Sequence, residues 1–158
     1  MLFLFHFIYT IHARYTQLVG FGRVQNPMDA GKTKILLVED DSTIREALAL
    51  TFTKEGFIVS EAVDGEDGLK KAFGEHPVLI MLDLIMPKMD GMTMLKKLRE
   101  DDWGKDVPVI ILTNVNSDAN LQQIVEHRPA YYLVKSDTPL VTVVEKAREV
   151  IERPAQSS

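Results

Sequence analysis

The chain has 158 residues, of which 46% are hydrophobic and 26% are charged, and its formal net charge is −5. This length and composition predict one globular domain with a substantial core and leave no room for a second full domain. The negative charge gives no electrostatic reason to expect a nucleic acid as a partner. The chain contains no cysteine, which excludes disulfides, thiolate zinc sites and a cysteine nucleophile and fits a reducing compartment.

Residues 1–33 differ in composition from the rest of the chain. They begin with the apolar stretch MLFLFHFIYTI, which is too short to span a bilayer, for which about 20 residues are needed. It also lacks the basic residues and the cleavage site of a secretory signal. A start codon assigned too far upstream of Met28 explains this stretch; a patch that docks on a membrane or a partner, or an extra helix or strand, are the alternatives. We expect an extension over 1–33, disordered or mis-assigned, a domain over 34–152 and a short tail over 153–158.

Apolar runs of strand length alternate with segments of helical periodicity from Lys34 onward. The runs are Ile35–Val38, Phe57–Val59, Val78–Leu82, Val107–Leu112 and Tyr131–Val134. One helix face is predicted from Ile44, Ala47, Leu48, Thr51 and Phe52, and a second from Leu140, Val143, Val144, Ala147 and Ile151. Continuous apolar strands indicate burial on both faces of a sheet. The pattern therefore predicts an α/β fold of five βα units, a doubly wound parallel sheet with helices on both faces.

Polar side chains follow four of the five predicted strands. They are Glu39, Asp40 and Asp41 after the first strand, Asp83 after the third, Thr113 and Asn114 after the fourth, and Lys135 and Ser136 after the fifth. Ligands of doubly wound sheets bind beyond the carboxyl ends of the strands, so these side chains are candidates for one site. Crowded carboxylates repel one another unless a cation is present or their pKa values shift. Mg²⁺ suits such a site because it takes one or two carboxylates and shares its remaining shell with water and phosphate.

Two further acids have a simpler interpretation. Asp41 stands one place beyond the acidic pair, and Asp90 precedes Gly91 at the start of a helical segment. Both are predicted to cap the helices that follow them.

The segments ILLVEDDSTIR, LDLIMPKMDG, IILTN and YYLVK occur in this order, and they resemble the receiver domain of two-component response regulators. The resemblance runs from Lys34 to Glu152. It implies a flavodoxin-like five-stranded parallel sheet of order 2-1-3-4-5. It also implies a cytoplasmic signalling protein that is not an enzyme toward other molecules, has no membrane span, binds no nucleic acid, and is a monomer or weak dimer.

The resemblance implies that Asp83 accepts a phosphoryl group from a sensor histidine kinase or a histidine phosphotransfer protein. Glu39 and Asp40 match the acidic pair of the family. Asp40, Asp83 and the backbone carbonyl of Ile85 are then expected to bind Mg²⁺ directly, while Glu39 acts mostly through water.

Three further roles follow from the same resemblance. Thr113 is expected to donate a hydrogen bond to a phosphoryl oxygen, and Lys135 to pair with its charge. Tyr132, three residues before the lysine, matches the aromatic residue that switches position. The signal is then expected to pass to a downstream protein target, because only a few residues follow Ile151 and a single-domain regulator is predicted.

The chain departs from the family pattern at three places. Ser136 replaces the usual proline, which leaves the loop of Lys135 less rigidly set, and Asn114 replaces a small residue and is expected to slow exchange with small phosphodonors. The segment 126–130 lacks the usual glycine before the fifth strand, so the surface there is a candidate for recognising an unusual partner.

Two other functions share part of this residue pattern. An aspartate-nucleophile phosphatase needs a second acid two residues after the first, where this chain has Ile85. A receiver-like docking module that works without phosphorylation usually lacks one or more of the acids that this chain keeps, and it is the alternative to phosphoryl acceptance.

Overall fold

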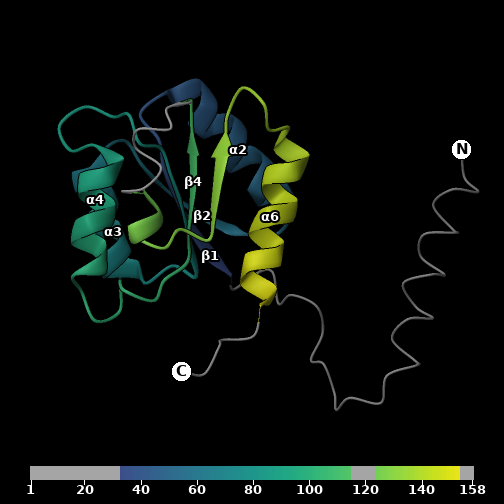
Figure 1. Cartoon of the computed structure of the whole chain (residues 1–158). Helices are drawn as coiled ribbons and strands as arrows, with labels where there is room; N and C mark the ends of the chain where they lie inside the picture. Colours follow the sequence, from purple (N-terminus) through teal and green to yellow (C-terminus); the bar gives the residue numbers. More distant parts are fainter. Residues whose placement is uncertain (1–32, 115–123, 154–158) are drawn as a thin grey trace, which may run out of the picture.

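The computed structural model of the chain describes residues 33–114 and 124–153 (Figure 1). The strands are β1 (Lys34–Val38), β2 (Ile58–Ala62), β3 (Leu79–Leu82), β4 (Val109–Thr113) and β5 (Tyr131–Val134). The helices are α2 (Ser42–Lys54), α3 (Gly65–Glu75), α4 (Gly91–Arg99) and α6 (Leu140–Glu152). In this part of the chain no helix is both long and apolar enough to cross a bilayer.

The five strands form one sheet of order β2-β1-β3-β4-β5, and every neighbouring pair is parallel. The predicted fold and strand order are thus confirmed. Because all strands run in the same direction, their carboxyl ends meet at one edge of the sheet. Strand β3 lies at the centre, between β1 and β4, so the residue after β3 stands in the middle of that edge.

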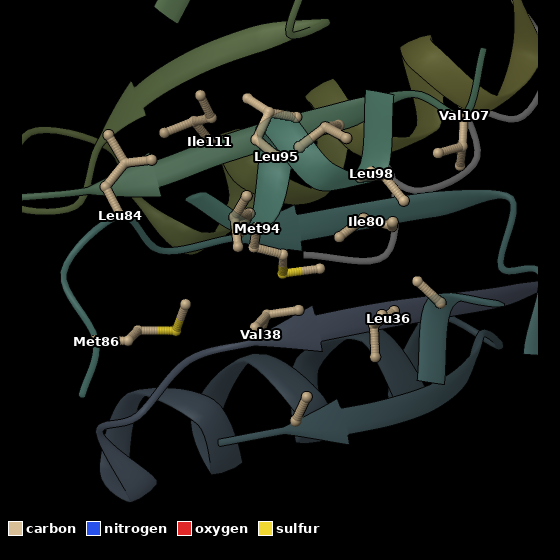
Figure 2. Close-up of a cluster of buried hydrophobic side chains, with 14 of the residues drawn as sticks. Leu36, Val38, Ile80, Leu84, Met86, Met94, Leu95, Leu98, Val107 and Ile111 are labelled. Carbon is tan, nitrogen blue, oxygen red and sulfur yellow. The ribbon is translucent and has the colours of Figure 1, made fainter. Parts of the chain in front are cut away.

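Helices cover both faces of the sheet, with α3 and α4 on one side and α2 and α6 on the other (Figure 1). Successive side chains along a strand point to opposite faces of the sheet. Figure 2 shows the first core, in which Leu36, Val38 and Ile80 lie beneath Met94 and Leu98 of α4. The second core joins the remaining strand positions to α2 and α6 and contains Ile35, Leu37, Leu48, Phe52, Leu79, Met81, Ile110, Val143 and Ala147. Burial on both faces explains why the strands read as unbroken apolar runs.

Three of the described helices begin with an aspartate cap. All three caps lie at the edge of the sheet where the carboxyl ends of the strands meet, which we call the functional edge. The side chain of Asp41 accepts hydrogen bonds from the backbone amides of Thr43 and Ile44, at 2.8 and 3.1 Å. Asp90 accepts one from the amide of Thr93 at 2.8 Å, and Asp64 caps α3 in the same way. The two predicted caps, Asp41 and Asp90, are therefore confirmed, and both act on backbone amides.

Some predicted boundaries and faces differ from the structure. Phe57 is buried but precedes β2, because its amide donates to the carbonyl of Phe52 at the end of α2. Val107 is buried but precedes β4, since its carbonyl accepts from Arg99. Leu140, predicted on the buried face of α6, is exposed there.

Two predictions fall largely outside the described residues. Of the helix expected between β4 and β5, the structure describes residues 124–126, which are helical. The predicted extension over 1–33 lies outside the described residues, except for its last residue.

Gly91 lies against the chain that leaves β3. A Cβ atom added to Gly91 would lie 2.0 Å from the backbone oxygen of Asp83, whereas one added to Gly74 in α3 would meet nothing within 4 Å. We expect Gly91→Ala to lower the free energy of unfolding by about 3 kcal/mol or more, the upper end of what overpacking costs. Gly74→Ala, the matched control, should raise it by about 0.5–1 kcal/mol. Urea unfolding measures both, and equal effects would contradict the tight contact at Gly91.

Candidate functional site

Three carboxylates from two strand ends meet at the centre of the functional edge. Glu39 and Asp40 follow β1, and Asp83 follows β3. One oxygen from each of the three lies within 4.8 Å of the others. Glu39 and Asp83 are buried, with 3% and 6% of their surfaces exposed, while Asp40 is exposed. The strand ends predicted to converge therefore do so.

Lys135 joins the two buried carboxylates. Its Nζ atom lies 2.5 Å from Oε2 of Glu39 and 2.8 Å from Oδ2 of Asp83. Its backbone amide donates to the carbonyl of Thr113 at 2.9 Å, which ties the lysine to the neighbouring strand end. Lys135 thus reaches both acids even though Ser136 follows it in place of the usual proline.

Burial and ion pairing shift the pKa values at this site. Burial raises the pKa of Glu39 above its usual 4.5, although the hydrogen bond and charge of Lys135 oppose this. For Lys135, burial lowers the pKa, but the hydrogen bonds and charges of Asp83 and Glu39 outweigh burial, and the net pKa is raised. The lysine is therefore held in its charged form.

The two oxygens of Asp83 have different partners. Oδ2 accepts from Lys135, while Oδ1 accepts from the backbone amides of Leu84 and Ile85, at 2.7 and 3.3 Å. The orientation of the carboxylate is thereby fixed both by Lys135, which follows β5, and by the loop that follows Asp83 itself. The side chain of Ile85 is 65% exposed, and the expected role of its carbonyl as a metal ligand stays a prediction.

Thr113 ends β4 and is completely buried. Within residues 33–114 and 124–153, its hydroxyl has no hydrogen-bond partner. A buried hydroxyl without a partner is unfavourable by about 1–3 kcal/mol, so it is a group ready to donate to an acceptor brought into the site.

Tyr132 lies on β5, which β4 separates from β3 and its Asp83. It is partly buried against the core on the α4 side, and burial raises the pKa of its phenol. Its partner across the sheet is Ile111, two positions before Thr113. The structure thus places the predicted switch residue beside the strand that carries Thr113, and its role stays a prediction.

Arg45 was not identified from the sequence, yet it supports the acidic pair. Its Nη1 atom donates to the backbone carbonyls of Glu39 and Asp40, at 2.8 and 3.2 Å, and its Nε lies 3.3 Å from Oε2 of Glu61. The arginine therefore braces the backbone that presents the two acids. Nothing in its spacing from Glu39 distinguishes it from an ordinary helix residue.

The donor set fits a hard divalent cation. Three carboxylates lie close together, and two of them are buried, where mutual repulsion is poorly screened. Oxygen donors of this kind suit Mg²⁺ or Ca²⁺ rather than a soft metal.

A sequence profile described as the response regulator receiver domain matches residues 35–145. The chain belongs to the response regulator receiver family. Receiver domains are signalling modules of two-component systems rather than ordinary enzymes, and they interact with kinases or phosphotransfer proteins and with downstream targets. The predicted family is thus confirmed.

Similar proteins include full-length regulators and isolated receivers. Transcriptional regulatory protein AfsQ1 of Streptomyces coelicolor is 40% identical over 101 residues, which cover 64% of this chain and 44% of AfsQ1. Transcriptional regulatory protein ResD of Bacillus subtilis is 34% identical over 127 residues, covering 80% of this chain and 51% of ResD. The structure of chemotaxis response regulator CheY4 of Vibrio cholerae matches with a TM-score of 0.69 and 29% identity, covering 75% of this chain and 98% of CheY4. The receiver chain spans about half the length of AfsQ1 and ResD.

Removing the ammonium of Lys135 should leave two buried acids without their cation. We expect Lys135→Met to lower the free energy of unfolding by about 3 kcal/mol near neutral pH, the lower end for breaking a buried ion pair. Lys135 opposes the burial that raises the pKa of Glu39, so without the lysine this pKa should rise further and the folded variant should bind the proton more tightly. The deficit should therefore be smallest below the usual glutamate pKa and grow as the pH rises through the raised one.

Urea unfolding across this pH range measures the effect. Lys146→Met is the matched control, because Lys146 forms an exposed ion pair with Glu149 on α6, and such pairs contribute little to stability. A deficit for Lys135→Met that does not change with pH would contradict the electrostatic explanation.

Proposed function

We propose that this receiver accepts a phosphoryl group on Asp83 from a histidine kinase or a histidine phosphotransfer protein, and signals to a protein partner by changing conformation. The observation that carries this proposal is the placement of Asp83. It is a buried carboxylate at the centre of the sheet edge, with a lysine on one oxygen and two backbone amides on the other. The family to which the chain belongs supports the same function.

We assign Mg²⁺ to the carboxylate cluster. Asp40, Asp83 and the backbone carbonyl of Ile85 would bind it directly, and Glu39 would act mostly through water. The ion supplies positive charge that neutralises phosphoryl oxygens as the group is transferred. The closeness of the three carboxylates supports this assignment.

The chain's own residues align and neutralise the reacting groups. One carboxylate oxygen of Asp83 attacks phosphorus as the bond from phosphorus to the donor's histidine nitrogen breaks, and that nitrogen keeps the bonding electrons. A carboxylate is a weak nucleophile, so the rate depends on its fixed orientation and on Lys135 beside the transferred charge. Water later cleaves the acyl phosphate, which releases inorganic phosphate and restores the carboxylate.

The conformational signal follows from the new charge of about −2. The buried hydroxyl of Thr113, without a partner among the described residues, gains an acceptor and moves toward it. The space that Thr113 leaves is then available to Tyr132, and the surface formed by β5 and α6 changes its preferred state.

Phosphorylation of Asp83 is tested by intact mass after incubation with Mg²⁺ and a small phosphodonor. We expect the wild type to gain the mass of one phosphoryl group and Asp83→Asn to gain none, because an amide is not a nucleophile of this kind. Asp90→Asn is the matched control on the same loop, since asparagine also caps α4 and the acceptor is intact. Labelling of Asp83→Asn would show that another residue accepts the phosphoryl group. An unlabelled wild type would favour a docking module that works without phosphorylation.

The metal assignment predicts a difference between adjacent acids. Asp40→Asn should weaken Mg²⁺ binding about tenfold or more, because a charged ligand is lost. It should also raise the stability of the metal-free protein, since one repelling charge is gone.

Asp41→Asn, one position along, keeps the cap of α2 and should leave Mg²⁺ binding nearly unchanged. Titration calorimetry measures the affinities, and thermal unfolding measures the stabilities. Equal losses of affinity in the two variants would show a general charge effect and contradict a specific role for Asp40.

A further inference from the structure

An ion pair outside the acid cluster holds the loop that leaves Asp83. This loop, residues 84–90, connects β3 to α4. Nζ of Lys88 lies 2.6 Å from Oδ2 of Asp64, which stands just before α3. The side chain of Asp64 is 3% exposed and that of Lys88 is 64% exposed. The lysine therefore reaches from the surface to an acid that is buried between two loops.

Both oxygens of Asp64 are used, and for different purposes. Oδ1 accepts from the backbone amides of Glu66 and Asp67, at 3.0 and 2.9 Å, and so caps α3. Oδ2 accepts from Lys88. The amide of Asp67 and then Lys88 hold the pKa of Asp64 below its usual value, so the carboxylate is charged. The cap explains one oxygen, while the ion pair with the distant loop needs a separate explanation.

A second contact ties the same two segments together. The amide of Gly65 donates to the carbonyl of Met89 at 3.0 Å. A Cβ atom on Gly65 would lie 2.6 Å from that carbonyl, so the two backbones approach closely. Lys88 has a φ of 62°, in the left-handed region that side chains other than glycine rarely adopt. Adjacent loop residues are thus held against adjacent residues at the start of α3.

The same loop determines the surroundings of Asp83. Its first two amides, from Leu84 and Ile85, donate to Oδ1 of Asp83. Its far end is closed by the amide of Gly91, which donates to the carbonyl of Leu84 at 3.0 Å. The loop is therefore fixed at both ends and also held at Lys88 and Met89.

We propose that Asp64 and Lys88 are positioning residues that hold the loop after Asp83 in the conformation needed for metal binding and phosphoryl acceptance. They do so by keeping the amides of Leu84 and Ile85 on Asp83 and the backbone of Ile85 at the metal site. This proposal rests on the proposed function for its metal and its phosphoryl group. Neither Asp64 nor Lys88 touches the reacting atoms.

The sign of the effect on metal binding separates positioning from charge. A positive charge repels Mg²⁺, so loss of the Lys88 charge acting through space alone would tighten Mg²⁺ binding. Loss of a group that orients metal ligands weakens it instead, commonly ten- to a hundredfold for direct supports. Because Lys88 acts through the loop backbone, we expect Lys88→Met to weaken Mg²⁺ binding by about three- to tenfold.

The variants are chosen to keep the fold. Lys88→Met removes an exposed charge and keeps most of the side chain. Asp64→Asn removes the charge of the acid while asparagine still caps α3. Lys88→Arg is the conservative variant. Lys105→Met is the matched control, because Lys105 is an exposed lysine like Lys88 but pairs with an exposed acid, Asp102, in the loop after α4.

Three measurements are made on the full chain: amide hydrogen exchange of Leu84 and Ile85 without metal, Mg²⁺ affinity by calorimetry, and the rate of labelling by acetyl phosphate. We expect Lys88→Met and Asp64→Asn to speed amide exchange, weaken Mg²⁺ binding and slow labelling. In each measurement the two variants should change by a similar factor. The double variant should be no worse than the worse single variant, because the two residues act as one pair. Lys88→Arg should retain wild-type values, and Lys105→Met should change none of them.

Two results would overturn the proposal. One is a loss of thermal stability in Lys88→Met with unchanged exchange and Mg²⁺ affinity, which would make the pair a structural tie only. The other is tighter Mg²⁺ binding, which would make Lys88 a distant charge. A wild type that takes neither Mg²⁺ nor a phosphoryl group would refute the proposed function instead, and amide exchange at Leu84 and Ile85 would still decide whether the pair positions the loop.

Discussion

The site depends on one electrostatic constraint, which is that two carboxylates are buried side by side and need a cation between them. Glu39 and Asp83 come from different strands, and Lys135 comes from a third. A lysine bridging both at 2.5 and 2.8 Å satisfies the constraint. Because all strands run in the same direction, their carboxyl ends lie at one edge of the sheet, which brings the two acids and the lysine together. The parallel topology thereby places a cation beside the two buried acids.

The apolar layers confine the chemistry to one edge of the sheet. Because helices cover both faces, the strand interiors carry aliphatic side chains, and polar groups gather where the strands end. The same edge holds many acids, yet they have separate roles. Asp41, Asp64 and Asp90 face the amides that begin three helices, whereas Glu39, Asp40 and Asp83 cluster around one point. The backbone amides at the starts of these helices thus stabilise the negative charges of the three capping acids.

Sequence reasoning could predict what depends on period and order along the chain. Unbroken apolar runs predicted the sheet, and the residues after those runs predicted the meeting of Glu39, Asp83 and Lys135. It could not predict contacts that depend on how two loops fold against each other, such as the pair of Asp64 and Lys88, which are far apart in the sequence. Arg45 was missed for the same reason, because its partners are backbone carbonyls that carry no residue signature. Strand boundaries shifted where a helix end or an arginine took the backbone group that a strand would have used.

The strand order has a consequence for how the protein is made. After β1 and β2 pair, β3 adds to β1, β4 adds to β3, and β5 adds to β4, so each new strand joins an edge that already exists. Each strand from β2 onward therefore finds a sheet neighbour that has already been synthesised. The acids arrive with the early strands, whereas their lysine arrives with the last one. A nascent chain that stops short of β5 carries the three acids without Lys135, so the charge at this edge of the sheet is balanced only once β5 and the lysine after it have been made.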